Sequence, residues 1–269
     1  MTEGSVLEII DLELEVRAGT DTVEILRKVS LTIGAGESLG LVGQSGSGKS
    51  MTARCITRLL PPSAVTRGRI LFGGNDVLTL DRTQLRRFRS HDVAMVFQDP
   101  RAYINPLQTI GEFLVEGLVT NHGKCRREAT ATVTALLDDV GVAGAQRRLR
   151  QRPYELSGGM LQRVMIAAAL AIEPRLLLAD EPTTALDVTT QEEVAAILSE
   201  LRSERGLAML FITHDLDLAS AVCDSLAVMK DGCVVEKLDA RDPGRAATHP
   251  YTRQLLDARV PFSPKDGVA

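Results

Sequence analysis

The sequence predicts an α/β fold in which parallel strands end in loops that carry polar residues. Three observations lead to this prediction. The apolar run at residues 39–42 enters a segment rich in glycine and serine, residues 43–50. A second apolar run, residues 176–179, ends in the acids Asp180 and Glu181. Strand-like and helix-like segments then alternate toward the C-terminus, as in a parallel sheet with crossover helices.

Strands dominate the first hundred residues. They are expected at residues 7–16, 23–33, 69–72 and 93–97. The first alternates apolar and polar side chains, which is typical of a half-buried strand, and the second does so less regularly. We expect turns at residues 17–21 and 34–36. A helix should begin near Lys49 and stop at Pro61 and Pro62, because proline cannot continue a helix.

Between about residues 99 and 152 strand signals disappear and helical periodicity replaces them. In residues 130–140 the apolar side chains share one helical face. We therefore predict a helical region that extends to about Pro174. Beyond it, strands are expected at residues 176–180, 208–213, 224–230 and 233–237, and helices at residues 191–205, 216–222 and 249–256. Asp231-Gly232 is a strong signal for a hairpin turn.

The segment at residues 43–50 has the pattern G-x-x-x-x-G-K-S, which is typical of a loop that binds nucleotide phosphates. Its glycines let backbone N–H groups turn inward around a polyphosphate, and the following helix points its positive end at that anion. We expect Lys49 to reach the β- and γ-phosphates and Ser50 to bind Mg²⁺. The alternative is a simple turn between strand and helix. The residues expected at the nucleotide are Gly43, Ser45, Gly46, Gly48, Lys49 and Ser50.

Two further segments indicate nucleotide chemistry. Ser157-Gly158-Gly159 precedes an apolar run; the alternative is a turn in which Ser157 caps a helix. Asp180 stands where a Mg²⁺ ligand is needed, and Glu181 where a base could orient water. The alternative for this pair is a solvated strand end. The order of the three segments is not explained by these alternatives.

This order resembles the ATP-binding-cassette family, the nucleotide-binding subunits of ABC transporters. The resemblance also includes Gln98, the segment Ala185-Leu186-Asp187 and His214. For His214 the alternative is helix capping beside Asp215. Together these motifs cover about residues 7–236 and are highly specific.

The resemblance implies a P-loop NTPase fold, an ABC cassette with a RecA-like core, an antiparallel β subdomain and an inserted helical subdomain. The implied domains are an ATP-binding core with the β subdomain at residues 1–98 and 175–238, a helical signature subdomain at 99–174 and a C-terminal tail at 239–269. The implied activity is ATP hydrolysis coupled to transmembrane transport, with ATP and Mg²⁺ as cofactors.

The resemblance also implies roles for individual residues. Glu181 would be the general base, His214 would contact the γ-phosphate, and Gln98 would reach Mg²⁺ or the attacking water. Two cassettes pack head to tail in the family, so residues 157–159 of one chain would close on ATP held by the other. The residues that would hold the metal are Ser50, Gln98 and Asp180.

Finer details resemble the dipeptide, oligopeptide and nickel importers. They are Phe97-Gln98-Asp99-Pro100, the sequence LSGGMLQRVMI at residues 156–166 and the sequence HPYTRQLL at residues 249–256. Met160 stands where many cassettes carry Gln. A chain with Met at this position resembles the first of the two paired ATPases of such importers. The implied partners are a second, non-identical ABC ATPase, two transmembrane permease subunits and an extracytoplasmic solute-binding protein. The permease groove would include Tyr103, Ile104, Pro106 and Phe113.

Composition narrows the alternatives. The 269 residues are 44% hydrophobic and 25% charged, which is typical of a globular protein with an ample core. The net charge of -4 argues against a nucleic-acid partner. The longest apolar run, residues 164–172, is too short to span a bilayer, and the N-terminus lacks a signal-peptide pattern. These features favour the cytoplasm, and the resemblance implies a peripheral location on the cytoplasmic face of the membrane, held by the permease subunits.

The cysteines are Cys55, Cys125, Cys223 and Cys233. Their wide spacing favours buried thiols over disulfides or a zinc site. In the family that this chain resembles, the chain often continues past the HPYT segment into a cysteine-bearing tail that can hold an iron–sulfur cluster, but no cysteine follows Cys233 here, so no cluster is expected.

Three rival functions are an exporter cassette, a non-transport ABC ATPase and a catalytically inactive scaffold. Non-transport heads carry a long coiled-coil insertion, and no heptads occur here between the phosphate loop and residues 157–159. The presence of Lys49, Asp180, Glu181 and His214 argues against an inactive scaffold.

The adenine pocket is expected to lack an aromatic platform. In the family an aromatic ring commonly stacks on adenine from the turn after the first strand, near Val16 or Arg17, and this chain has no aromatic residue before Phe72. Base–aromatic stacking contributes about 1–3 kcal/mol in nucleic-acid binders. Val16→Tyr should therefore tighten ATP binding, and the wild type should prefer ATP over GTP by less than about tenfold, roughly 1.4 kcal/mol.

Titrations of ATP and GTP against the wild type and Val16→Tyr test this expectation. An unchanged affinity in the variant, together with a wild-type preference above about tenfold, would show that the Ile25 region or a partner chain covers the base.

Overall fold

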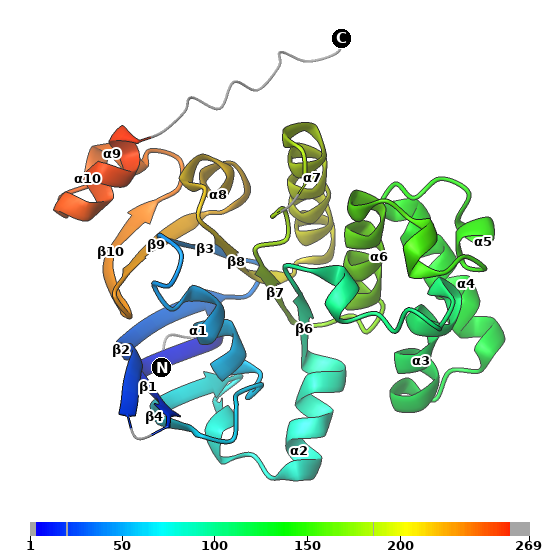
Figure 1. Ribbon diagram of the computed structural model, residues 1–269, viewed down its shortest axis with the longest axis horizontal. Coiled ribbons are helices and arrows are strands. Elements are labelled where there is room, and N and C mark those ends of the chain that lie inside the picture. Colours follow the sequence, from blue (N-terminus) through cyan, green and yellow to red (C-terminus); the bar gives the residue numbers. More distant parts are fainter. Residues whose placement is uncertain (1–3, 20, 185, 259–269) are drawn as a thin grey trace.

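The computed structural model describes residues 4–19, 21–184 and 186–258, which form two β-sheets and a group of helices to one side of them (Figure 1). Four parts of the expectations lie outside the described residues. They are residues 1–3 of the core, residue 20 of the turn at 17–21, Ala185 of the motif after Glu181, and residues 259–269 of the tail.

The first sheet is antiparallel, with the strand order β2-β1-β4-β5. Its strands are β1 (Ser5–Ala18), β2 (Asp21–Gly34), β4 (Ala64–Phe72) and β5 (Asn75–Asp76). The two strands expected first are confirmed, but the turn between them is shorter than expected because Ala18 still pairs with Asp21. β4 begins at Ala64 instead of residue 69, since Ala64 pairs with Val16 of β1.

The second sheet has the strand order β10-β9-β3-β8-β7-β6. Its strands are β3 (Ser38–Val42), β6 (Val93–Val96), β7 (Leu176–Asp180), β8 (Ala208–Thr213), β9 (Ser225–Lys230) and β10 (Cys233–Asp239). All neighbours pair in parallel except β9 and β10, which form the expected hairpin at Asp231-Gly232. The carboxyl ends of β3, β6, β7 and β8 therefore lie along one edge of the sheet.

The parallel strands are buried on both faces. In β8, Met209 and Phe211 belong to one hydrophobic core, whereas Leu210 and Ile212 belong to the other. Successive strand residues point to opposite faces, so one apolar run serves both cores. The first core includes side chains of α6 (Gly158–Leu170), α7 (Val188–Arg205) and α8 (Leu216–Val222), and the second includes α1 (Lys49–Ile56) and the antiparallel sheet.

The predicted helical region contains α3 (Ile110–His122), α4 (Arg126–Asp139), α5 (Ala145–Arg148) and α6, which lie together in Figure 1. α3 begins with a capping box, because Thr109 and Glu112 satisfy each other's backbone N–H groups. The helix expected at 130–140 is confirmed, but it begins at Arg126. Gln162 of α6 is 2% exposed and donates a hydrogen bond of 3.4 Å to the carbonyl oxygen of Phe97.

The other described elements are short. They are α2 (Arg82–Arg87), a π-helical turn (Phe88–Asp92), α9 (Pro243–Ala246), α10 (Pro250–Asp257), and 3₁₀ turns at Val77–Thr79, Pro100–Ala102 and Pro153–Glu155. α10 confirms the helix expected at 249–256. The prediction that the helix from Lys49 continues to Pro61 is wrong: α1 ends at Ile56, and Arg58 adopts a left-handed backbone with φ of 52°. α7 begins at Val188 instead of residue 191, because the Asp187 side chain caps it.

Two of the four cysteines are buried as expected. Burial raises the pKa of Cys55 and of Cys223 to about 12. The expectation is wrong for Cys125, which is exposed at the start of α4, and for Cys233, which is half-buried on the edge strand β10. All four are free thiols.

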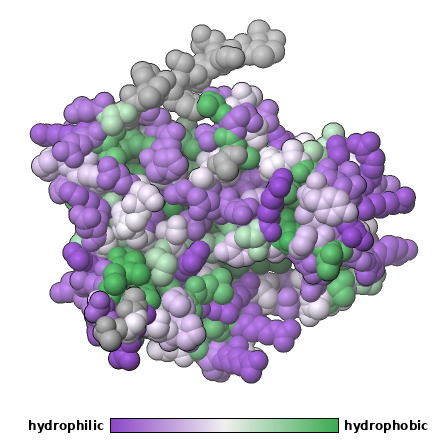
Figure 2. All heavy atoms as spheres, viewed as in Figure 1, coloured by the Kyte–Doolittle hydropathy of each residue, from purple (hydrophilic) through white to green (hydrophobic). Residues whose placement is uncertain are grey.

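Hydrophilic side chains predominate on the face seen in Figure 2, with small separate hydrophobic areas between them. Among the described residues, no helix combines the length and the hydropathy needed to cross a bilayer.

Candidate functional site

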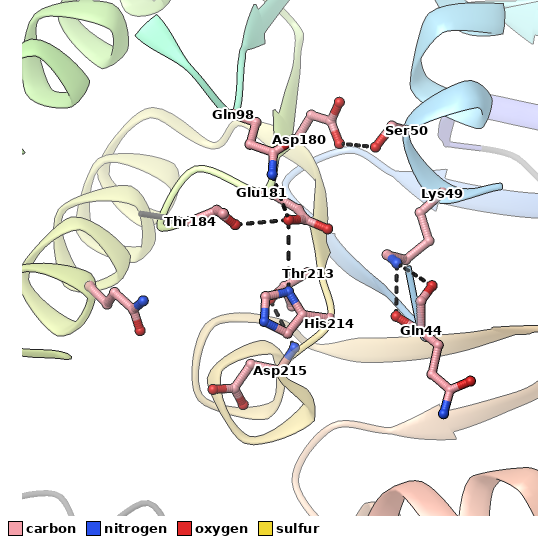
Figure 3. Close-up of polar contacts among 12 residues, drawn as sticks. Gln44, Lys49, Ser50, Gln98, Asp180, Glu181, Thr184, Thr213, His214 and Asp215 are labelled. Carbon is pink, nitrogen blue, oxygen red and sulfur yellow. Dashed lines mark hydrogen bonds and ion pairs between the residues drawn. The ribbon is translucent and has the colours of Figure 1, made fainter. Parts of the chain in front are cut away.

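Four polar segments meet where the parallel strands end. The loop at residues 43–48 follows β3, Gln98 comes shortly after β6, Glu181 follows β7, and His214 follows β8. Figure 3 shows the side chains of Gln98, Glu181 and His214 close together, with Lys49 beside them on the side of the phosphate loop. The shared direction of the strands thus brings together residues from four distant parts of the sequence.

The phosphate loop leaves backbone N–H groups available to an anion. Gly48, with φ of 104°, is the N-cap residue of α1 and has no side chain. The N–H groups in the first turn of α1 therefore have no side-chain acceptor at the N-cap. The Ser47 hydroxyl is buried without a hydrogen-bond partner among the described residues. At Gly43 a Cβ atom would lie 2.1 Å from the carbonyl oxygen of Met229, so only glycine fits against β9. These features fit a bound polyphosphate.

Lys49 is a buried cation at the base of this loop. The residue is only 4% exposed. Its Nζ donates hydrogen bonds to the carbonyl oxygens of Gly43 at 2.7 Å and Gln44 at 2.9 Å. Burial lowers the pKa of Lys49, while the nearby carboxylates of Glu181 and Asp180 act in the opposite direction. The ammonium group therefore rests on the loop backbone beside two acids.

Ser50 and Asp180 form a direct pair. The Ser50 hydroxyl donates a 2.7 Å hydrogen bond to Asp180, which is 5% exposed. Burial raises the pKa of Asp180, and the Ser50 hydrogen bond opposes this only in part. A hydroxyl and one carboxylate suit Mg²⁺, which takes few protein ligands when phosphates supply others. The described residues contain no cluster of three or more His, Cys, Asp or Glu residues that could hold a metal by itself.

Glu181 is held in a strained position. Its φ of 46° lies in the left-handed region, which is uncommon for residues other than glycine. One carboxylate oxygen, Oε2, accepts from Thr184 Oγ1 at 2.8 Å and from Gln98 Nε2 at 3.1 Å, and His214 Nδ1 lies 3.7 Å away (Figure 3). All three contacts use the same oxygen, which leaves Oε1 for other partners. Gln98 thus contacts Glu181 and not the Ser50–Asp180 pair.

Thr184 is a contact that the sequence interpretation missed. The local sequence does not mark it, because its hydroxyl reaches the Glu181 carboxylate only through the shape of the turn at residues 181–184. The alternative for His214 is wrong, because Asp215 caps α8 by accepting from the N–H groups of Asp217 and Leu218. His214 is 62% exposed and is free to meet a ligand in front of Glu181.

The segment Ser157-Gly158-Gly159 lies elsewhere. Ser157 caps α6, as its alternative interpretation predicted, with its hydroxyl accepting from Met160 N at 3.3 Å. The segment lines a cavity of about 450 Å³ together with Asp187 and Thr190. None of the lining residues in the described part of the chain comes from the phosphate loop, so a single chain does not bring these two predicted parts of the site together.

An apolar groove lies between β6 and the helical region. It has a volume of about 360 Å³ and is lined by Tyr103 and Phe113 together with Phe97 and Leu59. The rings of Phe97 and Tyr103 stack with centroids 3.7 Å apart. Two of the four residues expected here do not line it: Ile104 is 2% exposed and part of the core, and Pro106 is exposed outside the groove.

Comparisons with known proteins agree with this geometry. The sequence model of the family described as "ABC transporter" matches residues 26–184. The chain is 41% identical over 261 residues to the "Oligopeptide transport ATP-binding protein OppD" of Salmonella typhimurium, covering 97% of this chain and 78% of that protein. It is 44% identical over 265 residues to the "Probable D,D-dipeptide transport ATP-binding protein DdpD" of Escherichia coli, covering 98% and 80%.

Solved structures show the same architecture. A dimeric structure of the ATP-binding cassette MJ0796, described as a post-hydrolysis state bound to ADP and Pi, superposes with a TM-score of 0.78 at 30% identity, covering 87% of this chain and 99% of that one. The cbiO1 protein of Clostridium perfringens, described as part of the transporter complex cbiONQ, superposes with a TM-score of 0.76 at 28% identity, covering 89% and 90%.

The buried charge of Asp180 should cost stability in the ligand-free chain. Because burial raises its pKa above the ordinary 3.8, the folded state is penalised once the pH rises past that value. Asp180→Asn keeps an acceptor for Ser50 but removes the charge. At pH 7 its melting temperature without ligand should match or exceed that of the wild type, by about 2–4 °C per kcal/mol gained. Stabilisation by Mg-ATP should be lost.

Thermal melts with and without Mg-ATP measure both effects. The exposed Asp138 provides a matched control, Asp138→Asn, which should leave both melts unchanged. A lower ligand-free melting temperature for Asp180→Asn would contradict the argument.

Proposed function

Because the chain belongs to the ABC transporter family and is an ATPase, we propose that it powers the import of peptides or a related small solute. The observation that carries ATP hydrolysis is the position of the Glu181 carboxylate. Gln98 and Thr184 hold it through one oxygen, and it lies near the buried Lys49 and the hydrogen-bonded pair of Ser50 and Asp180. Most of the length of this chain is similar to peptide-transport ATPases, which favours import over the alternatives of an exporter cassette or a non-transport ATPase.

The phosphate loop would hold ATP. Backbone N–H groups from Ser45 to Ser50 would surround the phosphates, and Lys49 would exchange its carbonyl partners for phosphate oxygens. The participating residues would be Gly43, Ser45, Gly46, Gly48, Lys49 and Ser50. Ser50 and Asp180 would hold Mg²⁺, whose positive charge favours the ionised form of a carboxylate that burial otherwise disfavours.

Glu181 would be the general base. Since Thr184 and Gln98 occupy Oε2, the oxygen Oε1 would accept the proton of the attacking water. His214 would contact the γ-phosphate and orient that water, because it is exposed and lies beside Glu181. Gln98 would signal whether the site is filled, by leaving Glu181 for the metal or the water.

The complete site would require a second cassette. The Ser157 cavity is open and separate from the phosphate loop, so its helix N-terminus is available to ATP bound by another chain. The partner would be a non-identical paralogue. Two transmembrane permease subunits would dock short cytoplasmic helices in the groove of Tyr103 and Phe113, holding the chain at the cytoplasmic face of the membrane. An extracytoplasmic solute-binding protein would deliver the substrate.

Glu181→Gln should retain ATP binding and lose hydrolysis. Glutamine has the same shape as glutamate, with an NH₂ group in place of one carboxylate oxygen. Its amide cannot accept the proton of the attacking water. Turnover in the assembled transporter should fall by orders of magnitude, and the ATP-bound dimer should accumulate. Glu204→Gln, at an exposed position of α7, is the matched control and should behave as the wild type. Near wild-type turnover by Glu181→Gln would rule out Glu181 as the base.

The permease groove can be tested by crosslinking at Leu107. This side chain is 76% exposed in the segment that follows the stacked Tyr103, so a cysteine there disturbs no packing. In a Cys125→Ser background, Leu107→Cys should crosslink to a permease subunit in the intact complex. Val23→Cys, 51% exposed on the antiparallel sheet, is the control and should not. Crosslinks from both positions, or from neither, would refute docking at this groove.

A further inference from the structure

The peptide group between Gly43 and Gln44 is held on both sides. Its carbonyl oxygen accepts the 2.7 Å hydrogen bond from Lys49 Nζ. Its N–H group, on Gln44, donates a 2.9 Å hydrogen bond to the hydroxyl of Tyr251. Lys49 belongs to the phosphate-loop motif itself, whereas Tyr251 belongs to α10, near the C-terminal end of the described chain. The orientation of this peptide group therefore depends on a residue far away in the sequence.

Tyr251 is firmly placed. Its residue is 5% exposed, and it lies in the first turn of α10, where the His249 side chain caps the helix by accepting from the Tyr251 N–H group. Lys230, at the end of β9, places its ammonium group 5.2 Å from the centre of the Tyr251 ring. The ring is thus fixed against the same strand on which Gly43 packs.

Glu236 of β10 fastens the segment that leads into α10. One of its carboxylate oxygens accepts from Thr248 N at 2.6 Å, from the Thr248 hydroxyl at 2.7 Å and from His249 N at 3.2 Å. Burial acts to raise the pKa of Glu236, but the neighbouring Thr252 hydroxyl and the hydrogen bonds from Thr248 and His249 outweigh it and hold the pKa at about 2. The carboxylate is therefore ionised at neutral pH, and the helix is attached to the sheet by charge-assisted hydrogen bonds.

We propose that Tyr251 is a positioning residue for nucleotide binding, which acts by fixing the Gly43–Gln44 peptide group. The proposal rests on the proposed function of the phosphate loop. With the N–H group of Gln44 turned to Tyr251, the carbonyl oxygen of Gly43 is turned to Lys49, and the loop keeps the form that receives phosphates. Without the hydroxyl, the peptide group gains freedom that ATP binding must remove.

Tyr251→Phe removes the hydroxyl and keeps the ring on Lys230. We expect the Kd for Mg-ATP of the full chain to rise about three- to tenfold, the range for one lost hydrogen bond. Amide hydrogen exchange at Gln44 should become faster in the absence of nucleotide. The melting temperature should change little, because the apolar packing is retained. Tyr154→Phe, at a side chain 68% exposed, is the matched control and should change neither the Kd nor the exchange rate.

A second variant separates positioning from packing. Glu236→Gln leaves Tyr251 intact but weakens the attachment of α10, so it should change the Kd and the Gln44 exchange rate in the same direction as Tyr251→Phe. Faster Gln44 exchange together with a weaker Kd in both variants supports the proposal. Unchanged exchange and unchanged Kd in Tyr251→Phe overturn it, whatever the melting temperature does.

The experiment also distinguishes this proposal from the proposed function. If the wild-type chain binds no Mg-ATP, the proposed function fails, while the exchange measurement on Gln44 still reports whether Tyr251 fixes the loop. If the wild type binds Mg-ATP and Tyr251→Phe binds equally well, only the role of Tyr251 fails.

Discussion

The burial of the Lys49 ammonium is the constraint on which the site depends. A buried cation without partners is costly, so the ligand-free chain must supply acceptors. It does so with the carbonyl oxygens of Gly43 and Gln44, and the carboxylates of Asp180 and Glu181 lie close enough to favour the charge. An anion entering the loop would replace the two carbonyl acceptors, which are in place before it arrives. The loop is therefore built before its ligand is bound.

The parallel sheet makes this arrangement possible. Each strand that ends at the site is buried on both faces and sends alternate side chains into two cores, so its end cannot shift without disturbing both. β3 lies between β8 and β9, and β7 lies beside β8. Asp180 and Glu181 at the end of β7 and His214 directly after β8 are thereby fixed relative to the phosphate loop. The left-handed backbone of Glu181 is maintained in this rigid setting, where its N–H group donates to the carbonyl oxygen of Ile212 in β8.

Much of the fold could be predicted from the sequence because its apolar runs are long and its turns carry strong signals. The strands at 176–180 and 208–213 and the hairpin at Asp231-Gly232 follow directly from these patterns. The end of α1 could not, since Thr57 and Arg58 give no breaking signal before Pro61. Within the site, the residues after each strand could be predicted, whereas Thr184 and Tyr251 could not. Their roles depend on three-dimensional contacts that no local spacing reveals, and Ile104 was misplaced because apolar residues in a loop can face either the core or a groove.

The hydrogen bond from Gln162 to the Phe97 carbonyl gives the molecule a mechanical linkage. A buried amide donor cannot lose its acceptor without a cost of about 1–3 kcal/mol. A rigid-body rotation of α6 against the sheet must therefore strain this bond or pull the backbone next to Gln98 along with it. Gln98 in turn donates a hydrogen bond to Glu181, so α6 is connected to this carboxylate through Gln162, the backbone of Phe97 and the side chain of Gln98. A rotation of the helical region would in this way move a single amide group, that of Gln98, relative to the carboxylate of Glu181.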